Sequence, residues 1–182
     1  LPENLTEICE RVRLEKADLG IVVDPDADRL ALIADGGVYV SEELTQVLAA
    51  AFWWQYHSGP FVTNLSSSRA VELVAKSMGQ KVFRSAVGEI NVVEEMKARS
   101  AVIGGEGNGG VILPTLHYGR DALIGVALIL QYLVEKGMSL SEVIAEIPPL
   151  HMVKMKTNIG TLNPDIFLIR SRKNTPMSKY RR

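Results

Sequence analysis

The chain has 182 residues, of which 47% are hydrophobic, and it carries 20 basic and 21 acidic side chains for a formal net charge of −1. This length suits one domain, or one domain with part of another, and the apolar share excludes wholesale disorder. A single cysteine excludes both a disulfide framework and a zinc site built on paired cysteines. The longest apolar run, residues 122–134, is too short to span a membrane, and no signal segment opens the chain. We therefore expect a cytoplasmic protein with no membrane partner.

The basic residues gather at the C-terminal end. Residues 170–182 carry six basic groups and no acidic one, so the rest of the chain is net acidic. An acidic body argues against nucleic-acid binding, which requires a basic face with interleaved aromatic residues. The basic end lacks apolar periodicity, and we interpret residues 158–182 as a linker stub or a disordered tail. The chain also begins with Leu1 instead of Met, which hints at a fragment.

Apolar spacing and turn residues predict alternating helices and strands. In chain order we expect a helix at 5–12, strands at 20–23 and 30–34, a helix at 41–51, a strand at 61–65, a helix at 71–78, a strand at 81–84, a helix at 88–96, strands at 101–103 and 111–113, helices at 121–135 and 141–147, and a strand at 152–157. Ser41 is expected to cap the second helix, and the serines at 66–68 the third.

This alternation predicts an α/β fold: a three-layer α/β/α domain with a mixed, largely parallel sheet, preceded by a partial α/β domain. The boundary is expected near the glycines at 36–37. Only one helix and two strands precede it, which is too little for an independent core. Residues 1–35 are therefore expected to be the end of one domain, and residues 36–157 to form the next.

The segment DPDADR at residues 24–29 directly follows a predicted buried strand. Its three aspartates, Asp24, Asp26 and Asp28, stand at alternate positions, where unpaired carboxylates would repel and raise one another's pKa. A hard divalent cation such as Mg²⁺ or Ca²⁺ prefers oxygen ligands and resolves this repulsion. Arg29 can offset the remaining negative charge or reach a nearby phosphate. The plain alternative is an exposed acidic turn.

Two other motifs compete for this segment. An EF-hand needs Gly and Glu where this chain has Arg29 and Asp35, and it needs a helix ahead of the loop instead of a strand. A phosphatase of the haloacid dehalogenase type opens with an apolar strand and an Asp-x-Asp pair, which Asp24 and Asp26 match. That motif normally has Thr or Val where Asp28 stands, so the match is partial.

A second unusual segment, GGEGNGG at residues 104–110, follows another predicted strand. It contains a formal GxGxxG match, but the residues after it, 111–113, resemble a strand and not the helix that a dinucleotide site requires. Closely spaced glycines let the backbone approach a ligand, and Glu106 can accept hydrogen bonds from adjacent sugar hydroxyls. The plain alternative, a flexible glycine turn, leaves Glu106 and Asn108 without a role.

Both segments resemble loops of one enzyme family. ADLGIVVDPDADRL at residues 17–30 closely resembles the metal-binding loop of the α-D-phosphohexomutases, which comprise phosphoglucomutases, phosphomannomutases and phosphoglucosamine mutases. GEGNG at residues 105–109 is similar to the family's sugar-binding loop, and Pro114 and residues 119–122 match the pattern that follows it. The resemblance covers roughly residues 1–157, corresponding to the end of the family's second domain and all of its third.

The resemblance implies a role for each of these residues. Asp24, Asp26 and Asp28 would bind Mg²⁺, and Arg29 would lie near the transferring phosphoryl group. The substrate-binding residues would be Gly105, Glu106, Gly107 and Asn108. Residues 1–35 would be the C-terminal part of the metal-binding domain, and residues 36–157 the sugar-binding domain.

Family enzymes interconvert hexose 1-phosphates and hexose 6-phosphates through a phosphoserine, with a hexose 1,6-bisphosphate as activator or intermediate. Their serine loop and their phosphate clamp do not occur in this sequence. By this resemblance we expect a Mg²⁺- and hexose-phosphate-binding fragment that is inactive alone. Surfaces exposed by the missing domains would favour self-association. The choice among glucose, mannose and glucosamine phosphates is not fixed by one loop.

Two alternative functions remain open from the sequence. The first is a stand-alone Mg²⁺-dependent sugar phosphatase that uses Asp24 as its nucleophile. The second is a non-catalytic sugar-binding module that docks through its basic tail. Phosphate release from a sugar phosphate distinguishes the first, and binding titrations address the second.

Overall fold

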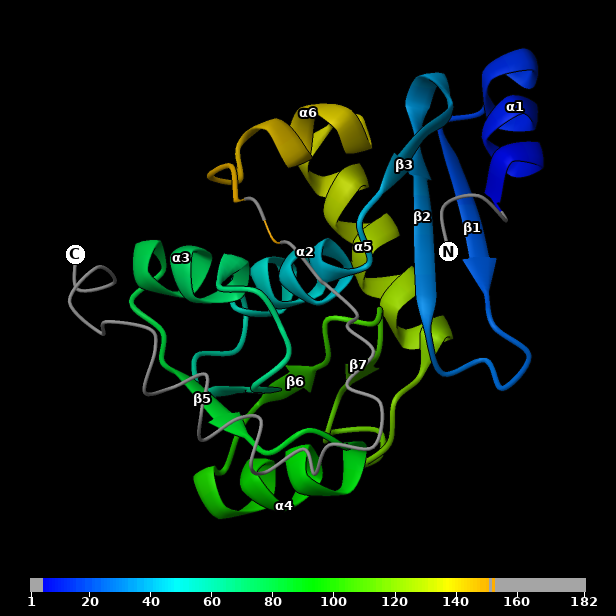
Figure 1. The fold of residues 1–182 in the computed structure, drawn as a ribbon. Coiled ribbons are helices and arrows are strands. Elements are labelled where there is room, and N and C mark those ends of the chain that lie inside the picture. Colours follow the sequence, from blue (N-terminus) through cyan, green and yellow to red (C-terminus); the bar gives the residue numbers. More distant parts are fainter. Residues whose placement is uncertain (1–4, 151, 153–182) are drawn as a thin grey trace, which may run out of the picture. The chain divides into compact units, whose positions relative to one another are not determined.

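The computed structural model describes residues 5–150 and residue 152. The basic tail interpreted from residues 158–182 lies outside the described residues, as does all but the first residue of the strand expected at 152–157. In chain order the elements are α1 (Thr6–Glu15), β1 (Leu19–Val23), β2 (Leu30–Ala34), the 3₁₀ turn η2 (Asp35–Gly37), β3 (Val38–Val40), α2 (Glu43–Trp53), β4 (Phe61–Asn64), α3 (Ala70–Ser77), β5 (Val82–Ser85), α4 (Glu89–Arg99), β6 (Ile103–Gly105), β7 (Val111–Ile112), α5 (Ala122–Lys136) and α6 (Leu140–Ala145) (Figure 1).

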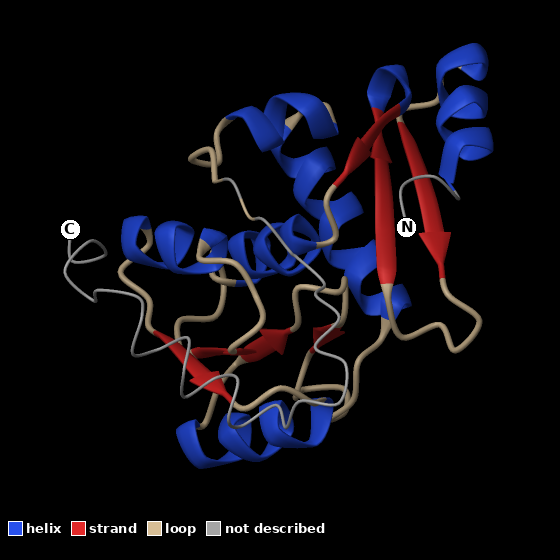
Figure 2. Ribbon diagram, in the orientation of Figure 1, coloured by secondary structure: helices blue, strands red, loops and turns tan. Residues whose placement is uncertain are grey.

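The main sheet has the strand order β5-β4-β6-β7. Strand β4 pairs in parallel with β5 and with β6, whereas β7 runs antiparallel to β6. Helix α4 packs on one face of the sheet, and α2 and α3 cover the other (Figure 2). This arrangement confirms the predicted three-layer α/β/α domain with a mixed, largely parallel sheet.

Strand β4 is buried on both faces, as expected for a central parallel strand. Successive side chains point to opposite faces of a strand. Phe61 accordingly joins the larger apolar cluster beneath α2, α3 and α5, and Val62 joins a smaller cluster with Val92 and Met96 of α4. The two clusters therefore lie on opposite faces of the sheet, each beneath its own helical layer.

A second, antiparallel sheet contains β1, β2 and β3, and α1 packs against it. Strand β3 was not predicted from the sequence. It follows η2, where Gly36 and Gly37 both have positive φ angles, and it pairs with β2 across the domain boundary expected at residue 35. Residues on both sides of that position belong to one compact unit. The division into residues 1–35 and 36–157 stays a prediction, because compactness alone does not separate the two parts.

The helix starts follow local hydrogen bonding. Helix α6 begins with a full capping box formed by Ser139 and Glu142. Asp121 caps α5 through hydrogen bonds from the backbone NH groups of Leu123 and Ile124. Helix α2 begins at Glu43 without a side-chain cap, so the expected cap by Ser41 does not form. Within residues 5–150, no helix is long and apolar enough to cross a bilayer.

Candidate metal and sugar site

The parallel strands of the main sheet bring several loops to one edge. The carboxyl ends of β4, β5 and β6 lead into residues 64–68, 85–88 and 106–110, which is where open α/β sheets usually bind ligands. The acidic loop, residues 24–29 between β1 and β2, reaches the same edge. The NH of Leu30, just after the acidic loop, donates to the carbonyl of Gly109 at 3.1 Å. Within the loop, the carbonyl of Ala27 accepts the NH of Ala122 at 3.0 Å.

Asp24 organises the acidic loop from within. Its Oδ1 accepts the backbone NH groups of Asp28 at 3.1 Å and Arg29 at 3.2 Å, and its Oδ2 accepts Nε of Arg29 at 2.6 Å. Burial pushes the pKa of Asp24 up, but hydrogen bonds from Arg29 and Asp28 outweigh this effect and lower the pKa to about 2. Asp24 is therefore ionised throughout the ordinary pH range.

Asp28 and Asp24 share one cationic atom. Nε of Arg29 lies 3.4 Å from Oδ1 of Asp28 as well as 2.6 Å from Asp24. That Oδ1 is buried without a hydrogen bond, while Oδ2 is held by Arg120. Carboxylate oxygens are the ligands that a hard divalent cation prefers, so the paired carboxylates of Asp24 and Asp28 suit such a cation. Oδ1 of Asp28, which has no hydrogen bond, is available as a ligand.

Asp26 does not join this pair in the structure. Its side chain is exposed, and residues 5–150 and 152 contain no group of three or more His, Cys, Asp or Glu side chains gathered closely enough to hold a metal. Two of the three predicted metal ligands are therefore brought together around Arg29, and the third is not.

The glycine loop, residues 104–110, turns sharply after β6 and packs against α2. Gly105 and Gly107 are both buried. A Cβ placed on Gly107 would lie 2.3 Å from the carboxylate of Glu43, which accepts the NH of Ser68 at 2.8 Å. Only glycine allows this close approach, so the predicted sugar-binding glycines serve the packing of the loop.

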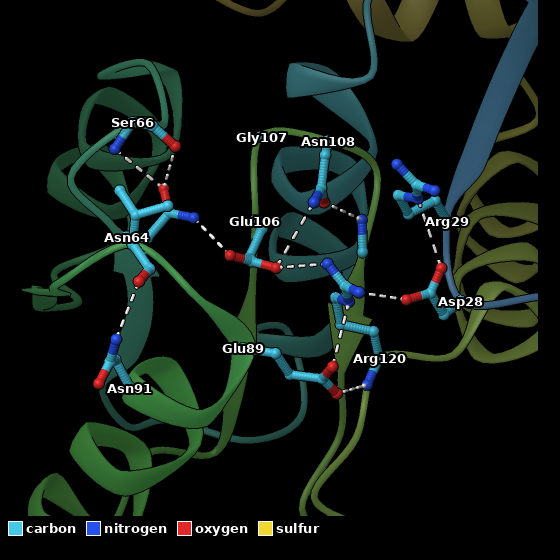
Figure 3. A network of polar contacts seen from close by, with 12 residues as sticks. Asp28, Arg29, Asn64, Ser66, Glu89, Asn91, Glu106, Gly107, Asn108 and Arg120 are labelled. Carbon is cyan, nitrogen blue, oxygen red and sulfur yellow. Dashed lines mark hydrogen bonds and ion pairs between the residues drawn. The ribbon is translucent and has the colours of Figure 1, made fainter. Parts of the chain in front are cut away.

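Glu106 lies at the centre of a polar network (Figure 3). Its side chain is 3% exposed. Oε1 accepts Nδ2 of Asn64 at 2.5 Å, and Oε2 accepts Nη1 of Arg120 at 2.7 Å and Nδ2 of Asn108 at 3.5 Å. Both oxygens therefore accept hydrogen bonds within the protein, and the contact of Glu106 with sugar hydroxyls stays a prediction.

A pocket of about 230 Å³ lies beside these loops. Its lining includes Asp24, Arg29 and Asn108 together with Glu42 and apolar residues of β1 and β2. The pocket thus has residues of both predicted motifs in its lining. Five other predicted site residues, Asp26, Asp28, Gly105, Glu106 and Gly107, do not line it.

Sequence reasoning missed several members of the network. Asn64, the last residue of β4, donates a hydrogen bond to Glu106. A polar residue at the end of a buried strand is the sequence feature that could have identified it. Arg120 was noted only as part of a matching segment. Glu89 accepts the backbone NH of Arg120 at 2.9 Å from the first turn of α4. Arg120 and Glu89 both lie in segments that match the family pattern, but that match assigned neither residue a role in the site.

The serines before α3 also have a role that differs from the expected helix cap. The hydroxyls of Ser66 and Ser67 donate to Oδ1 of Asn64, and the Ser67 hydroxyl accepts the NH of Gly107 at 2.9 Å. Only the Ser68 hydroxyl accepts from the start of α3, at 3.3 Å from the NH of Ala70. These serines connect β4 to the glycine loop.

Comparison with known proteins agrees with this geometry. Residues 41–151 match the family model described as phosphoglucomutase/phosphomannomutase, alpha/beta/alpha domain III. The chain is 35% identical over 158 residues to a phosphoglucomutase/phosphomannomutase of Thermococcus kodakarensis, covering 86% of this chain and 35% of that protein. It is 38% identical over 133 residues to the phosphoglucosamine mutase of Delftia acidovorans, covering 72% of this chain and 30% of that protein.

The fold comparison gives the same result. A phosphoglucomutase/phosphomannomutase family protein from Burkholderia thailandensis superposes with a TM-score of 0.70 at 19% identity, covering 82% of this chain and 33% of that one, and supports the fold alone. The chain spans about a third of the length of these proteins. Because the family model matches more than half of its residues, this chain belongs to the phosphoglucomutase/phosphomannomutase family of α-D-phosphohexomutases and contains the family's α/β/α domain III.

Proposed function

We propose that this chain is part of a Mg²⁺-dependent phosphohexomutase that interconverts hexose 1-phosphate and hexose 6-phosphate through a phosphoserine and a hexose 1,6-bisphosphate. One observation carries the proposal: the acidic loop and the glycine loop, about 80 residues apart in sequence, are joined at one edge of the sheet. The match of residues 41–151 to domain III supports the division into a metal-binding part, 1–35, and a sugar-binding part, 36–157.

The metal would be held by Asp24, Asp26 and Asp28. When bound, Mg²⁺ would supply positive charge that stabilises the transferring phosphoryl group. Arg29 already binds the carboxylate of Asp24 and lines the pocket, and we assign it to orient that phosphoryl group. For Asp26 to act as a ligand, its exposed side chain has to turn toward Asp24 and Asp28.

The sugar would be held by the glycine loop. Asn108 is exposed and lines the pocket, so its amide would reach a hydroxyl there. In the structure that amide donates to Glu106 at 3.5 Å and accepts the NH of Gly110 at 3.1 Å. Glu106 is buried, so the loop has to open before its carboxylate can accept a hydrogen bond from the ligand. Gly105 and Gly107 would act by keeping the loop backbone close to the sheet.

Charge at the site supports a requirement for the cation. Around the two loops, carboxylates outnumber guanidinium groups: Asp24, Asp28, Glu89 and Glu106 form ion pairs with two arginines, Arg29 and Arg120, and Asp26 adds a further exposed carboxylate. A hexose phosphate is itself an anion, and an acidic site repels it. Binding of the phosphate therefore requires added positive charge, which a divalent cation provides.

Calorimetric titration with Mg²⁺ tests the metal assignment. We expect Asp26→Ala to abolish or strongly weaken Mg²⁺ binding while leaving the fold intact, because the Asp26 side chain is exposed. Asp18→Ala is the matched control, since Asp18 is an exposed aspartate just before β1. Equal Mg²⁺ affinity in Asp26→Ala and the wild-type chain would contradict the assignment.

Turnover assays test whether the chain is catalytically inactive on its own. Because the sequence holds neither the family's serine loop nor its phosphate clamp, we expect the purified chain to interconvert no hexose phosphates. We also expect it to release no inorganic phosphate from a hexose phosphate with Mg²⁺ present. Phosphate release abolished by Asp24→Asn would instead establish the phosphatase alternative.

A further inference from the structure

Arg120 joins three segments that are distant in sequence. Its Nη2 donates to Oδ2 of Asp28 in the acidic loop, its Nη1 donates to Oε2 of Glu106 at 2.7 Å, and its Nε lies 3.5 Å from Oε2 of Glu89 at the start of α4 (Figure 3). The side chain is 19% exposed, so solvent and salt screen these ion pairs less than they screen surface pairs.

The position of Arg120 is built into the surrounding backbone. Its NH donates to Oε1 of Glu89 at 2.9 Å, and Arg120 forms a β-bridge with Ile112. The side chain then crosses Gly110, where a Cβ would lie 2.3 Å from Cδ of Arg120. These contacts direct a guanidinium group toward the acidic loop.

The contact with Asp28 places Arg120 on the carboxylate that would ligate a metal, beside its free oxygen. Oδ2 of Asp28 is occupied by Arg120, and Oδ1 faces Nε of Arg29 at 3.4 Å. Oδ1 is left to ligate a metal, but a metal bound there would lie on the same carboxylate as the Arg120 guanidinium. A guanidinium and a divalent cation also repel each other at such short range.

We propose that Arg120 is an internal counterion of the acidic loop, which neutralises Asp28 in the metal-free chain and gives it up when the loop binds a divalent cation. This inference rests on the proposed metal loop. Because the same guanidinium holds Glu106, Arg120 is also a positioning residue that links the metal loop to the carboxylate of the glycine loop.

Calorimetric titration with Mg²⁺ tests the competition. Removing the competing cation in Arg120→Met should tighten Mg²⁺ binding by on the order of tenfold, a typical size for coupling between neighbouring ligands. Arg120→Lys keeps a positive charge and should stay within about twofold of wild type on the same scale. Arg99→Met is the matched control, because Arg99 forms an ion pair with Glu95 at the other end of α4, and its affinity should not change.

A double-mutant cycle separates direct competition from a general loss of charge. Asp28→Asn should itself weaken Mg²⁺ binding, because it removes a proposed ligand. The affinity that remains in that background should respond little to Arg120→Met, because the shared partner has been removed. A tightening of equal size in both backgrounds would overturn the proposal, as would unchanged or weaker Mg²⁺ binding by folded Arg120→Met.

A measurement on the wild-type chain keeps the test independent of how well Arg120→Met folds. Arginine side-chain ¹⁵N NMR should show the Arg120 signals, assigned with Arg120→Lys, moving as Mg²⁺ is added and reaching a plateau at the calorimetric saturation point. Arg120 signals unchanged at saturation would refute the proposal while leaving Mg²⁺ binding established. Failure of the wild-type chain to bind Mg²⁺ would overturn the proposed function itself.

Discussion

The acidic loop and the glycine loop hold their carboxylates in opposite ways. The side chain of Asp24 is 17% exposed and takes its hydrogen bonds from residues four and five positions away. Glu106 is 3% exposed and is held by residues 42 and 14 positions away. Asp24 can therefore rearrange locally to accept a ligand, whereas Glu106 depends on the assembled sheet, as does Asp28 through its contact with Arg120.

Removing one carboxylate from each loop tests this difference with the largest expected effect. Glu106→Ala leaves Arg120 and Asn64 without their buried acceptor and should lower the free energy of unfolding by about 3 kcal/mol. Asp26→Ala removes an exposed carboxylate and should change it by less than about 0.5 kcal/mol. Urea denaturation of both variants measures the difference. Equal losses of stability would show that the two loops do not differ as described.

A substitution in the glycine loop tests its close packing. In Gly107→Ala the new methyl group would meet the buried Glu43 carboxylate, and we expect a loss of about 2 kcal/mol in the free energy of unfolding. Thermal unfolding followed by circular dichroism provides the measurement. Ala31→Gly in β2 is a useful comparison, since it adds no bulk and should cost only about 1 kcal/mol. A Gly107→Ala chain as stable as wild type would mean that Glu43 can move aside freely.

How much of this could be predicted from the sequence differs between the two loops. The element order followed from apolar runs and glycine turns, and the three aspartates were visible because their spacing is local. The burial of Glu106 was not visible, because Asn64 and Arg120 reach it only through the sheet topology. Strand β3 was missed for a related reason: three residues carry little local pattern, and β3 exists through its pairing with β2.

The pH dependence of stability sharpens the account of the acidic loop. The pKa of Asp24 is lowered to about 2 from 3.8, so its ionised form stabilises the folded chain above the unfolded value. This stabilisation should be lost as the pH falls from about 4 to about 2. In denaturation experiments the stability difference between wild type and Asp24→Asn should therefore shrink over that interval. A difference that stays constant with pH would show that the Asp24 charge is not stabilised by folding.

The smallest effect concerns the backbone of the acidic loop. Ala27 has a φ angle of 56°, a left-handed conformation that is unfavourable for residues with a Cβ. Replacing it with glycine relieves this strain but increases the entropy of the unfolded chain, and we expect a net stabilisation of about 0.5 kcal/mol. Urea denaturation of Ala27→Gly should detect the gain. A loss of stability would indicate that the entropy of the unfolded chain outweighs the strain.

The Mg²⁺ dependence of hexose 1,6-bisphosphate binding tests most directly whether the two loops form one site. In a titration followed by NMR, we predict that the bisphosphate binds in the presence of Mg²⁺ and shifts the signals of both Asn108 and the acidic loop. With Mg²⁺ removed by a chelator, the acidic excess of the site should repel the ligand and abolish these shifts. Binding of equal strength with and without Mg²⁺ would contradict a joint site.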